Sequence, residues 1–254
     1  MALHRGRETD QKEITMITEN TMKNVEKLIA TTSFQTFYRD YDWKNDQLTD
    51  GFREILHLEK SLTSAAKEQA IMKSHILEIA RWGGLPNIGK IQCYNDPLIL
   101  PLYEDNEIST AVKNDPTIAV RTIKQQTTGI GPTYISKVLR FSAPAQFGAI
   151  DSRLVRVFGL GDTQSGKLEL LKLKAKQAAG GRWFIGPDNW PDEYGTWIAI
   201  LNHITDVLNS SEISCPHPEQ FVAAGLREKG IWLTADVEMA LFSYASQTIY
   251  GKRQ

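Results

Sequence analysis

The chain has few cysteines and no long hydrophobic run. Cys93 and Cys215 are its two cysteines among 254 residues, and they lie far apart. Two thiols cannot supply the four ligands of an iron–sulfur cluster, and they do not suggest a disulfide framework. No apolar run approaches the roughly 18 residues that a membrane-spanning helix needs, and the polar N-terminus carries no secretory signal. We therefore expect a cytoplasmic protein without membrane association or an iron–sulfur cluster.

The chain also has little net charge, but that charge is unevenly distributed. The formal net charge is −1. Residues 121–182 contain eleven Lys or Arg against three Asp or Glu, which gives +8 there and −9 in the remainder. The lysines between positions 167 and 176 alone fit a solvated helix face. The whole basic segment is typical of a surface that faces phosphates.

Hydrophobic spacing indicates helices through most of the chain, and no segment alternates as a strand would. We predict an all-α, two-lobed helical bundle with a helix–hairpin–helix motif. Residues 1–13 are expected to be a disordered tail and 14–254 the folded part, with the hairpin in a lobe of about 106–185. The N- and C-terminal helices would form the other lobe. The predicted helices cover about 52–62 with a break near Ser61, 71–80, 116–126, 132–142, 191–208, and 234–248 with Thr234 as N-cap, while 83–101 and 180–189 are predicted loops.

A glycine turn joins two of these predicted helices. Gly129-Ile130-Gly131 is followed by Pro132, which is well suited to the first turn of a helix. Glycines expose backbone N–H groups, and a helix N-terminus adds a partial positive charge. The turn can therefore hold a phosphate without reading sequence, with Ile130 anchoring it in the core. A plain corner between two helices is the alternative.

Asp151 follows twenty residues after Gly131 and precedes S-R-L-V-R-V-F. An Asp in this position is a good N-cap for a short helix. Capping holds a carboxylate rigidly as an anion, and such a carboxylate can also stabilise a sugar cation or activate water. The two roles are compatible.

Residues 116–161 resemble the helix–hairpin–helix DNA glycosylase superfamily, which includes endonuclease III and the 8-oxoguanine glycosylases. Its pattern L-P-G-V-G-x-K-T-A, then V-D-T-H-V, is matched here by T-T-G-I-G-P-T-Y-I and A-I-D-S-R-L-V. The resemblance implies an enzyme that flips a damaged base from double-stranded DNA and cleaves its N-glycosidic bond. It gives the catalytic role to Asp151 and backbone contacts to the hairpin, and it requires no cofactor. It also implies a structural monovalent cation bound by the main-chain carbonyls of Gln125, Thr127 and Ile130.

The sequence departs from this pattern at two positions. Thr133 stands where bifunctional members carry a lysine, so the Schiff-base nucleophile is missing from its usual place. Lys137 lies one helical turn further along, which leaves a displaced lysine open. Arg153 replaces the family histidine and can still contact a phosphate, as can Thr133, Lys137 and Arg140. We therefore expect a monomeric, monofunctional glycosylase that leaves an intact abasic site.

Base recognition needs aromatic surfaces, and several tryptophans lie in or near predicted loops. Trp82, Trp183 and Trp190 are candidates for the base pocket, as is Trp43, while Asn87 is a candidate wedge; Trp197 and Phe242 are expected in the core. Two other interpretations stay open. The enzyme could remove a hypermodified base from foreign DNA as a defence, or the chain could be a non-catalytic DNA-binding protein.

Overall fold

The computed structural model describes residues 17–41, 53–161 and 168–251. Helices dominate these ranges, and the strands form three short antiparallel pairs. The prediction of a mostly helical protein is confirmed, but these strands were not predicted. Each has only two or three residues, too few for an alternating pattern to be visible in the sequence. The predicted tail (1–13) and Trp43 lie outside the described residues.

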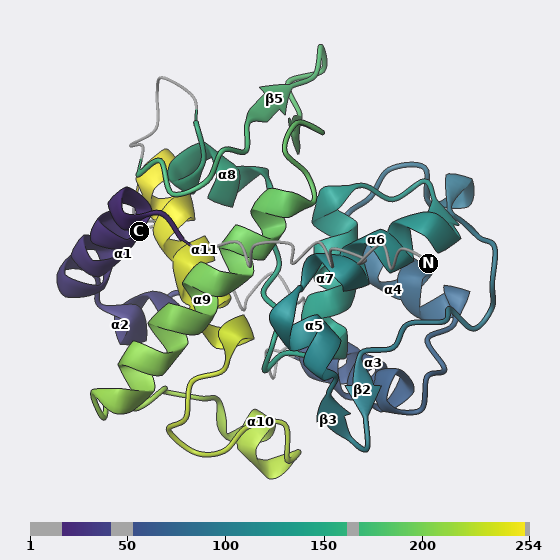
Figure 1. Cartoon of the computed structure of the whole chain (residues 1–254), viewed down its shortest axis with the longest axis horizontal. Coiled ribbons are helices and arrows are strands. Elements are labelled where there is room, and N and C mark those ends of the chain that lie inside the picture. The colour runs from purple at the N-terminus through teal and green to yellow at the C-terminus, as the bar shows by residue number, and fades with distance from the viewer. Residues whose placement is uncertain (1–16, 42–52, 162–167, 252–254) are drawn as a thin grey trace, which may run out of the picture.

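Figure 1 shows the helices in two groups that lie side by side. In the first group, α7 packs against α3, α4 and α6. Two small sheets belong to it, in which β1 pairs with β4 and β2 with β3. Its elements are α3 (Arg53–Lys67), α4 (Lys73–Trp82), the 3₁₀ turn η2 (Ile88–Lys90), β1 (Gln92–Cys93), β2 (Tyr103–Glu104), β3 (Glu107–Ile108), α5 (Thr110–Asn114), α6 (Thr117–Gln126), β4 (Thr127–Thr128) and α7 (Pro132–Ser142).

The second group combines the first and last helices of the described chain. Helix α11 packs against α2, α8 and α9. A β5–β6 hairpin projects beside α8, at the top of Figure 1. The elements are α1 (Glu19–Thr31), α2 (Phe34–Arg39), α8 (Ser152–Phe158), β5 (Ala175–Gln177), β6 (Trp183–Ile185), α9 (Asp192–Ser210), α10 (Glu219–Ala223) and α11 (Thr234–Tyr250).

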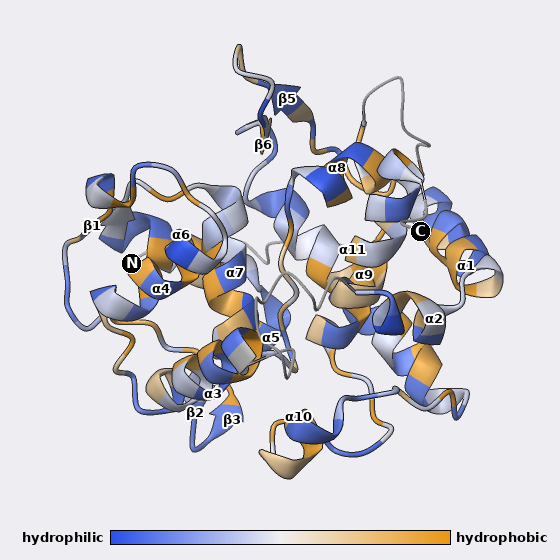
Figure 2. Ribbon diagram, turned by 180° about the vertical axis from the view of Figure 1, so that it is seen from behind, coloured by the Kyte–Doolittle hydropathy of each residue, from blue (hydrophilic) through white to orange (hydrophobic). Residues whose placement is uncertain are grey.

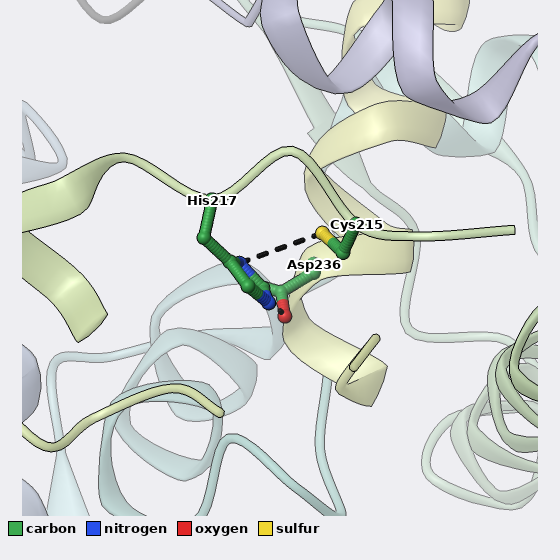
Figure 3. A group of neighbouring side chains, drawn as sticks. All are labelled: Cys215, His217 and Asp236. Atoms are coloured by element: carbon green, nitrogen blue, oxygen red, sulfur yellow. Dashed lines mark hydrogen bonds and ion pairs between the residues drawn. The ribbon is translucent and has the colours of Figure 1, made fainter. Parts of the chain in front are cut away.

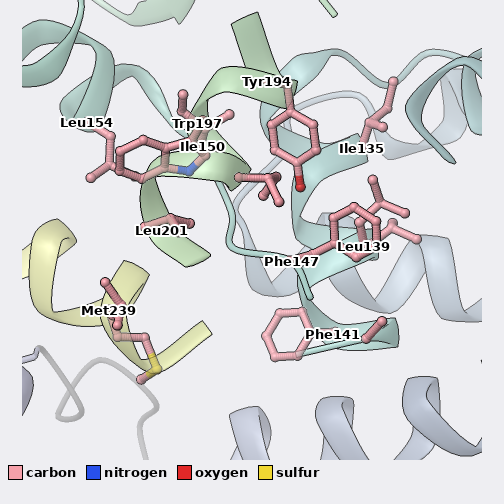
Figure 4. Close-up of a cluster of buried hydrophobic side chains, with 14 of the residues drawn as sticks. Ile135, Leu139, Phe141, Phe147, Ile150, Leu154, Tyr194, Trp197, Leu201 and Met239 are labelled. Carbon is pink, nitrogen blue, oxygen red and sulfur yellow. The ribbon is translucent and has the colours of Figure 1, made fainter. Parts of the chain in front are cut away.

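The segment 143–151 runs from α7 to α8 and connects the two groups. Helix α9 holds this segment through two buried side chains. The Tyr194 hydroxyl donates to the carbonyl oxygen of Gly148, and the Trp197 indole N–H donates to that of Ala149, both at 3.0 Å. Figure 4 shows both rings in the hydrophobic cluster that α7, the segment and α9 share. The backbone that leads to Asp151 is therefore fixed from its buried side.

The predicted helices are largely confirmed. Helices α6 and α7 cover the predicted ranges, and the apolar stripe of α9 from Tyr194 to Leu208 is buried apart from a partly exposed Val207. Figure 2 shows hydrophobic and hydrophilic residues alternating around the helices, as amphipathic packing requires. None of the described helices is long and apolar enough to cross a lipid bilayer.

Four local predictions were wrong. Helix α3 runs through Ser61 without a break, because its apolar face stays buried on both sides of that residue. Thr234 does not cap α11, because Leu233 is the N-cap residue. The Leu233 N–H donates to the Asp236 carboxylate at 3.0 Å. The Thr234 hydroxyl donates instead to the carbonyl oxygen of Ala145. Both predicted loops contain short regular elements. The loop at 83–101 contains η2 and strand β1, which pairs with β4. The loop at 180–189 contains strand β6, which pairs with β5.

The grouping of helices also differs from the expected hairpin lobe of about 106–185. Helices α3 and α4 pack against α7 and so belong with the hairpin, although they precede residue 106. Helix α8, inside that range, packs against α11 in the other group. Hydrophobic periodicity shows which face of a helix is buried but not which partner buries it, so the sequence could not place this boundary.

Candidate functional site

A cavity of ≈ 720 Å³ lies between the two helix groups. Helices α3, α4 and α7 of the first group contribute to its walls, and so do the start of α8 and helix α11 of the second. Cavities of this size hold small organic ligands, and a nucleobase is smaller than the available space. The predicted residues Trp82, Lys137, Asp151 and Arg153 all line it.

Asp151 is the N-cap of α8, as predicted. Its Oδ1 accepts hydrogen bonds from the backbone N–H groups of Arg153 at 2.9 Å and Leu154 at 3.0 Å. The side chain is partly exposed and faces the cavity. A carboxylate held in this way presents a fixed negative charge to whatever occupies the cavity.

Lys137 also points into the cavity, with its Nζ 4.7 Å from the centre of the Trp82 ring and 5.5 Å from that of Tyr134. Burial lowers the pKa of Lys137, and the negative charges of Asp151 and Glu238 oppose part of that shift. The amine therefore loses its proton more easily than an exposed lysine does. Its expected contact with a DNA phosphate stays a prediction, and Lys137 shares the cavity with Asp151.

Glu238 is a third charged group at this site, and the sequence analysis did not single it out. It projects from α11 and is buried. The pKa of its carboxyl group is raised to about 8, chiefly by burial and further by the negative charge of Asp151. Arg140, Lys137 and the backbone N–H of Ala149 oppose this rise. Glu238 is therefore protonated at neutral pH.

Arg140 does not face solvent, which contradicts the expected phosphate contact. It is 3% exposed and pairs with Glu59 of α3 at 2.8 Å. Glu59 also accepts from Arg227, which in turn holds Asp236 of α11 at 2.9 Å. This buried network of alternating charges ties the first helix group to the second, so Arg140 has a structural role.

The glycine turn has two different glycines. Gly129 has a φ of +82°, and a Cβ there would lie 2.5 Å from the carbonyl oxygen of Lys90, so only glycine fits. Gly131 has an ordinary φ and nothing within 4 Å of the corresponding Cβ position. It is the N-cap of α7, with no side-chain cap, and Ile130 packs against the core as predicted. The first turn of α7 is thus approachable at Gly131 and partly exposed Thr133.

The predicted cation ligands lie around this turn. Gln125 is in the last turn of α6, Thr127 is in β4, and Ile130 precedes α7. Strand β4 is held in place by pairing with β1. A cation bound by the carbonyl oxygens of these residues stays a prediction.

Two aromatic side chains that the sequence analysis discussed, Trp82 and Phe242, line the cavity. Trp82 lines the cavity and packs edge-on against Phe141 at 5.1 Å. Phe242, expected in the core, also lines the cavity, with the Arg153 guanidinium 4.9 Å from its ring centre.

The other predicted base-pocket and wedge residues in the described ranges do not line the cavity; they are Trp183, Trp190 and Asn87. Trp183 lies on β6 beneath the guanidinium of Arg156 at 4.5 Å, and Trp190 packs against Tyr194 at 5.3 Å. Asn87 is an exposed residue of a tight turn with a φ of +62°. Its role as a wedge is untested.

The basic segment is less exposed than its composition indicates. Arg140 and Arg156 are buried, and Arg121 pairs with Asp192 at 2.6 Å. The lysines from 172 to 176 lie not on a helix but on and before strand β5. Among the described residues of this segment, one exposed cation, Lys124, lies on α6. The other exposed cations lie around the β5–β6 hairpin and are Lys172, Lys174, Lys176 and Arg182. Phe184 of the same hairpin is 45% exposed.

A second cluster is formed by Cys215, His217 and Asp236 (Figure 3), none of which is among the residues that line the cavity. The three potential ligand atoms lie within 4.8 Å of one another. However, the Asp236 carboxylate already accepts hydrogen bonds from the Arg227 guanidinium. Burial, together with the negative charge of Asp236, raises the pKa of the Cys215 thiol far above its usual range. A metal ion would have to displace an arginine and deprotonate this thiol, so the cluster fits hydrogen bonding better than metal binding.

One sequence signal could have identified Glu238. It stands within D-V-E-M-A-L, where Val237 and Leu241 mark a buried helix face. A carboxyl group among residues that are otherwise buried and apolar is unusual enough to indicate a site. No comparable signal marks the cavity position of Phe242.

The chain was compared with protein-family models, with curated proteins and with solved structures, and none of the three comparisons found a match.

Proposed function

We propose that the protein is a DNA glycosylase that excises a damaged or modified base. One observation carries the proposal: Asp151 is held rigidly in the wall of a cavity large enough for a nucleobase. The order of the glycine turn, α7 and Asp151 along the chain adds to it, because it matches the helix–hairpin–helix glycosylase pattern. The whole cavity comes from a single chain, so a monomer suffices.

DNA binding would use the surface around the glycine turn. Gly131 leaves the first turn of α7 open to a phosphate, which the helix N-terminus attracts. The cationic β5–β6 hairpin offers a second contact, with exposed Phe184 available to pack against a base or sugar. These contacts would bind the backbone without reading sequence, as base flipping at varied positions requires.

The reaction would begin with the target nucleotide rotated into the cavity. Trp82 and Phe242 offer apolar surfaces to the base. As the bond between C1′ and the base nitrogen breaks, positive charge develops on the deoxyribose. The fixed carboxylate of Asp151 would stabilise that charge and orient a water molecule toward C1′, as carboxylates do in glycosidases.

The test uses duplexes that each carry one altered base, including 8-oxoguanine, uracil, hypoxanthine and a glucosylated hydroxymethylcytosine. Abasic sites are revealed by hot alkali. Asp151→Asn should slow release by roughly 10²-fold or more, since it removes the charge but keeps the shape. Asp206→Asn, an exposed carboxyl on α9, is the matched control and should act as the wild type does. Equal release by wild type and Asp151→Asn would refute the role of Asp151.

The same panel separates repair from defence, because selective release of the hypermodified base would indicate action on foreign DNA. Salt-sensitive binding without release of any base would indicate a non-catalytic DNA-binding protein instead.

A second candidate activity, strand cleavage, is favoured by the position of Lys137. Its amine shares the cavity with Asp151, and burial lowers its pKa. A neutral amine there could attack C1′ and displace the base with the electron pair of the broken bond, and opening of the sugar ring would then give a Schiff base. Thr133, in the place of the usual lysine, favours hydrolysis. Borohydride trapping of a covalent DNA adduct that is lost in Lys137→Met would establish the lyase activity.

A further inference from the structure

The proposed reaction leaves one need unmet, because a departing base must gain a proton. Asp151 is poorly suited to supply it, because the proposed reaction uses its carboxylate to stabilise the sugar cation and orient the water molecule. Glu238 reaches the same cavity from α11. The site therefore contains two carboxyl groups in different surroundings.

Gly148 makes the approach of Glu238 possible. A Cβ at position 148 would lie 2.8 Å from the Cβ of Glu238, so any larger residue would push α11 away from the segment that leads to Asp151. The carboxyl group accepts a hydrogen bond from the N–H of Ala149, two residues before Asp151. Both acids are thus held by one short stretch of backbone.

The groups that face Glu238 come from several elements. Lys137 and Arg140 of α7 provide positive charge, with the Arg140 Nε 4.0 Å away, and Asp151 provides negative charge from the start of α8. Across the cavity, α3 and α4 contribute further titratable side chains: Glu54, His57, Glu78 and Arg81. Burial outweighs the nearby cations and keeps Glu238 protonated at neutral pH, yet those cations can stabilise the carboxylate that forms once the proton has left.

We propose that Glu238 is the general acid that protonates the departing base. The proposal rests on the proposed glycosylase function. As the bond between C1′ and the base breaks, its electron pair goes to the base nitrogen, and the Glu238 proton passes to a nitrogen or oxygen atom of that base. Water adds its oxygen to C1′ and gives a proton to Asp151. Asp151 then releases that proton to solvent and solvent returns a proton to Glu238, so both acids are restored and the net reaction consumes one water molecule.

The experiment measures single-turnover release from pH 5 to 9, using the duplex that the wild type cleaves fastest. Glu238→Gln should slow release about 10²-fold at pH 6 to 7, where a general acid contributes most, and should remove the decline on the alkaline side. The dissociation constant for DNA should change less than threefold. Glu238→Asp should recover part of the rate, and Glu212→Gln, at an exposed carboxyl, is the matched control.

A second measurement is independent of activity. The side-chain carboxyl ¹³C resonance of Glu238, assigned by its absence in Glu238→Gln, should keep its protonated position at pH 7 and move only near pH 8. A resonance that titrates near the usual value for glutamate would overturn the proposal. So would unchanged rates in Glu238→Gln while Asp151→Asn is inactive, an outcome that leaves the proposed function standing. If the wild type releases no base at all, the proposed function fails and the role of Glu238 fails with it.

Discussion

The carboxylate of Asp151 accepts a hydrogen bond from the backbone N–H of Arg153 at 2.9 Å. This contact begins α8 and at the same time fixes the acid at the wall of the cavity. Structure and proposed chemistry therefore depend on the same side chain. Substitutions that retain one property and remove the other can separate them.

Asp151→Ser and Asp151→Asn keep a side-chain oxygen at the N-cap. Their free energies of unfolding should therefore lie within about 0.5 kcal/mol of the wild-type value. Asp151→Ala loses the cap and should be less stable by about 0.5–2 kcal/mol. Urea denaturation measures these differences. All three variants should lose excision, and an active Ser variant would contradict the role given to the carboxylate.

How far the sequence predicts this molecule depends on whether a signal is local. Pro132 and the acidic residues after Pro191 mark helix starts by themselves, so α7 and α9 were predicted well. The cap at Asp151 is equally local. In contrast, the burial of the Arg140 side chain depends on its ion pair with Glu59. Glu59 lies on a different helix, and no spacing along the chain can identify it as the partner. The cavity was unpredictable for the same reason, because its walls combine α3 and α4 with α7, α8 and α11, which come from separate parts of the chain.

The two turn glycines should respond differently to alanine. Gly129→Ala places a Cβ 2.5 Å from the Lys90 carbonyl oxygen at a positive φ, so we expect a loss of about 1–3 kcal/mol in stability. Gly131→Ala meets no protein atom and should leave the unfolding midpoint nearly unchanged. Its methyl group would instead obstruct a phosphate and weaken DNA binding about tenfold, which is about 1.4 kcal/mol. Thermal unfolding and fluorescence anisotropy check the pair; tight binding by Gly131→Ala would exclude the turn as the phosphate site.

The raised pKa of Glu238 predicts a specific dependence of stability on pH. Between about pH 4.5 and 8 the unfolded glutamate has lost its proton while the folded one keeps it, so the folded state binds more protons. Stability is therefore greatest at the acid end of this window and falls as pH rises to 8. Glu238→Gln lacks this loss, and its advantage over the wild type should grow with pH to the order of a few kcal/mol. Denaturation curves at pH 5, 6.5 and 8 measure it; a constant difference would show that Glu238 titrates normally.

Arg227 bonds to Glu59 of α3 and Asp236 of α11, so its removal leaves two buried carboxylates without their shared partner. We expect Arg227→Leu to cost about 3–5 kcal/mol, as loss of one member of a buried ion pair does. Lys176→Leu breaks a pair with Asp188 that is largely exposed, and it should cost less than about 1 kcal/mol. Guanidinium denaturation compares the two. Similar small losses would show that water screens the interior network.

Removal of divalent metal ions should have no effect on stability. The Cys215 thiol is kept protonated by burial, and Asp236 is occupied by Arg227. Dialysis against EDTA should therefore leave the melting temperature unchanged, and added zinc should not raise it. A rise of several degrees that is lost in Cys215→Ala would identify a metal site at this cluster.

The division of the cavity between α7–α8 and α11 limits how the proposed glycosylase activity could be inherited. A gene fragment encoding residues 53–161 would carry the glycine turn, Lys137 and Asp151, but it would lack the helix that bears Glu238 and Phe242. Grafting that fragment onto another protein should transfer affinity for the DNA backbone without transferring catalysis. If the proposed function holds, natural or engineered recombination would have to exchange α11 together with that fragment to transfer excision.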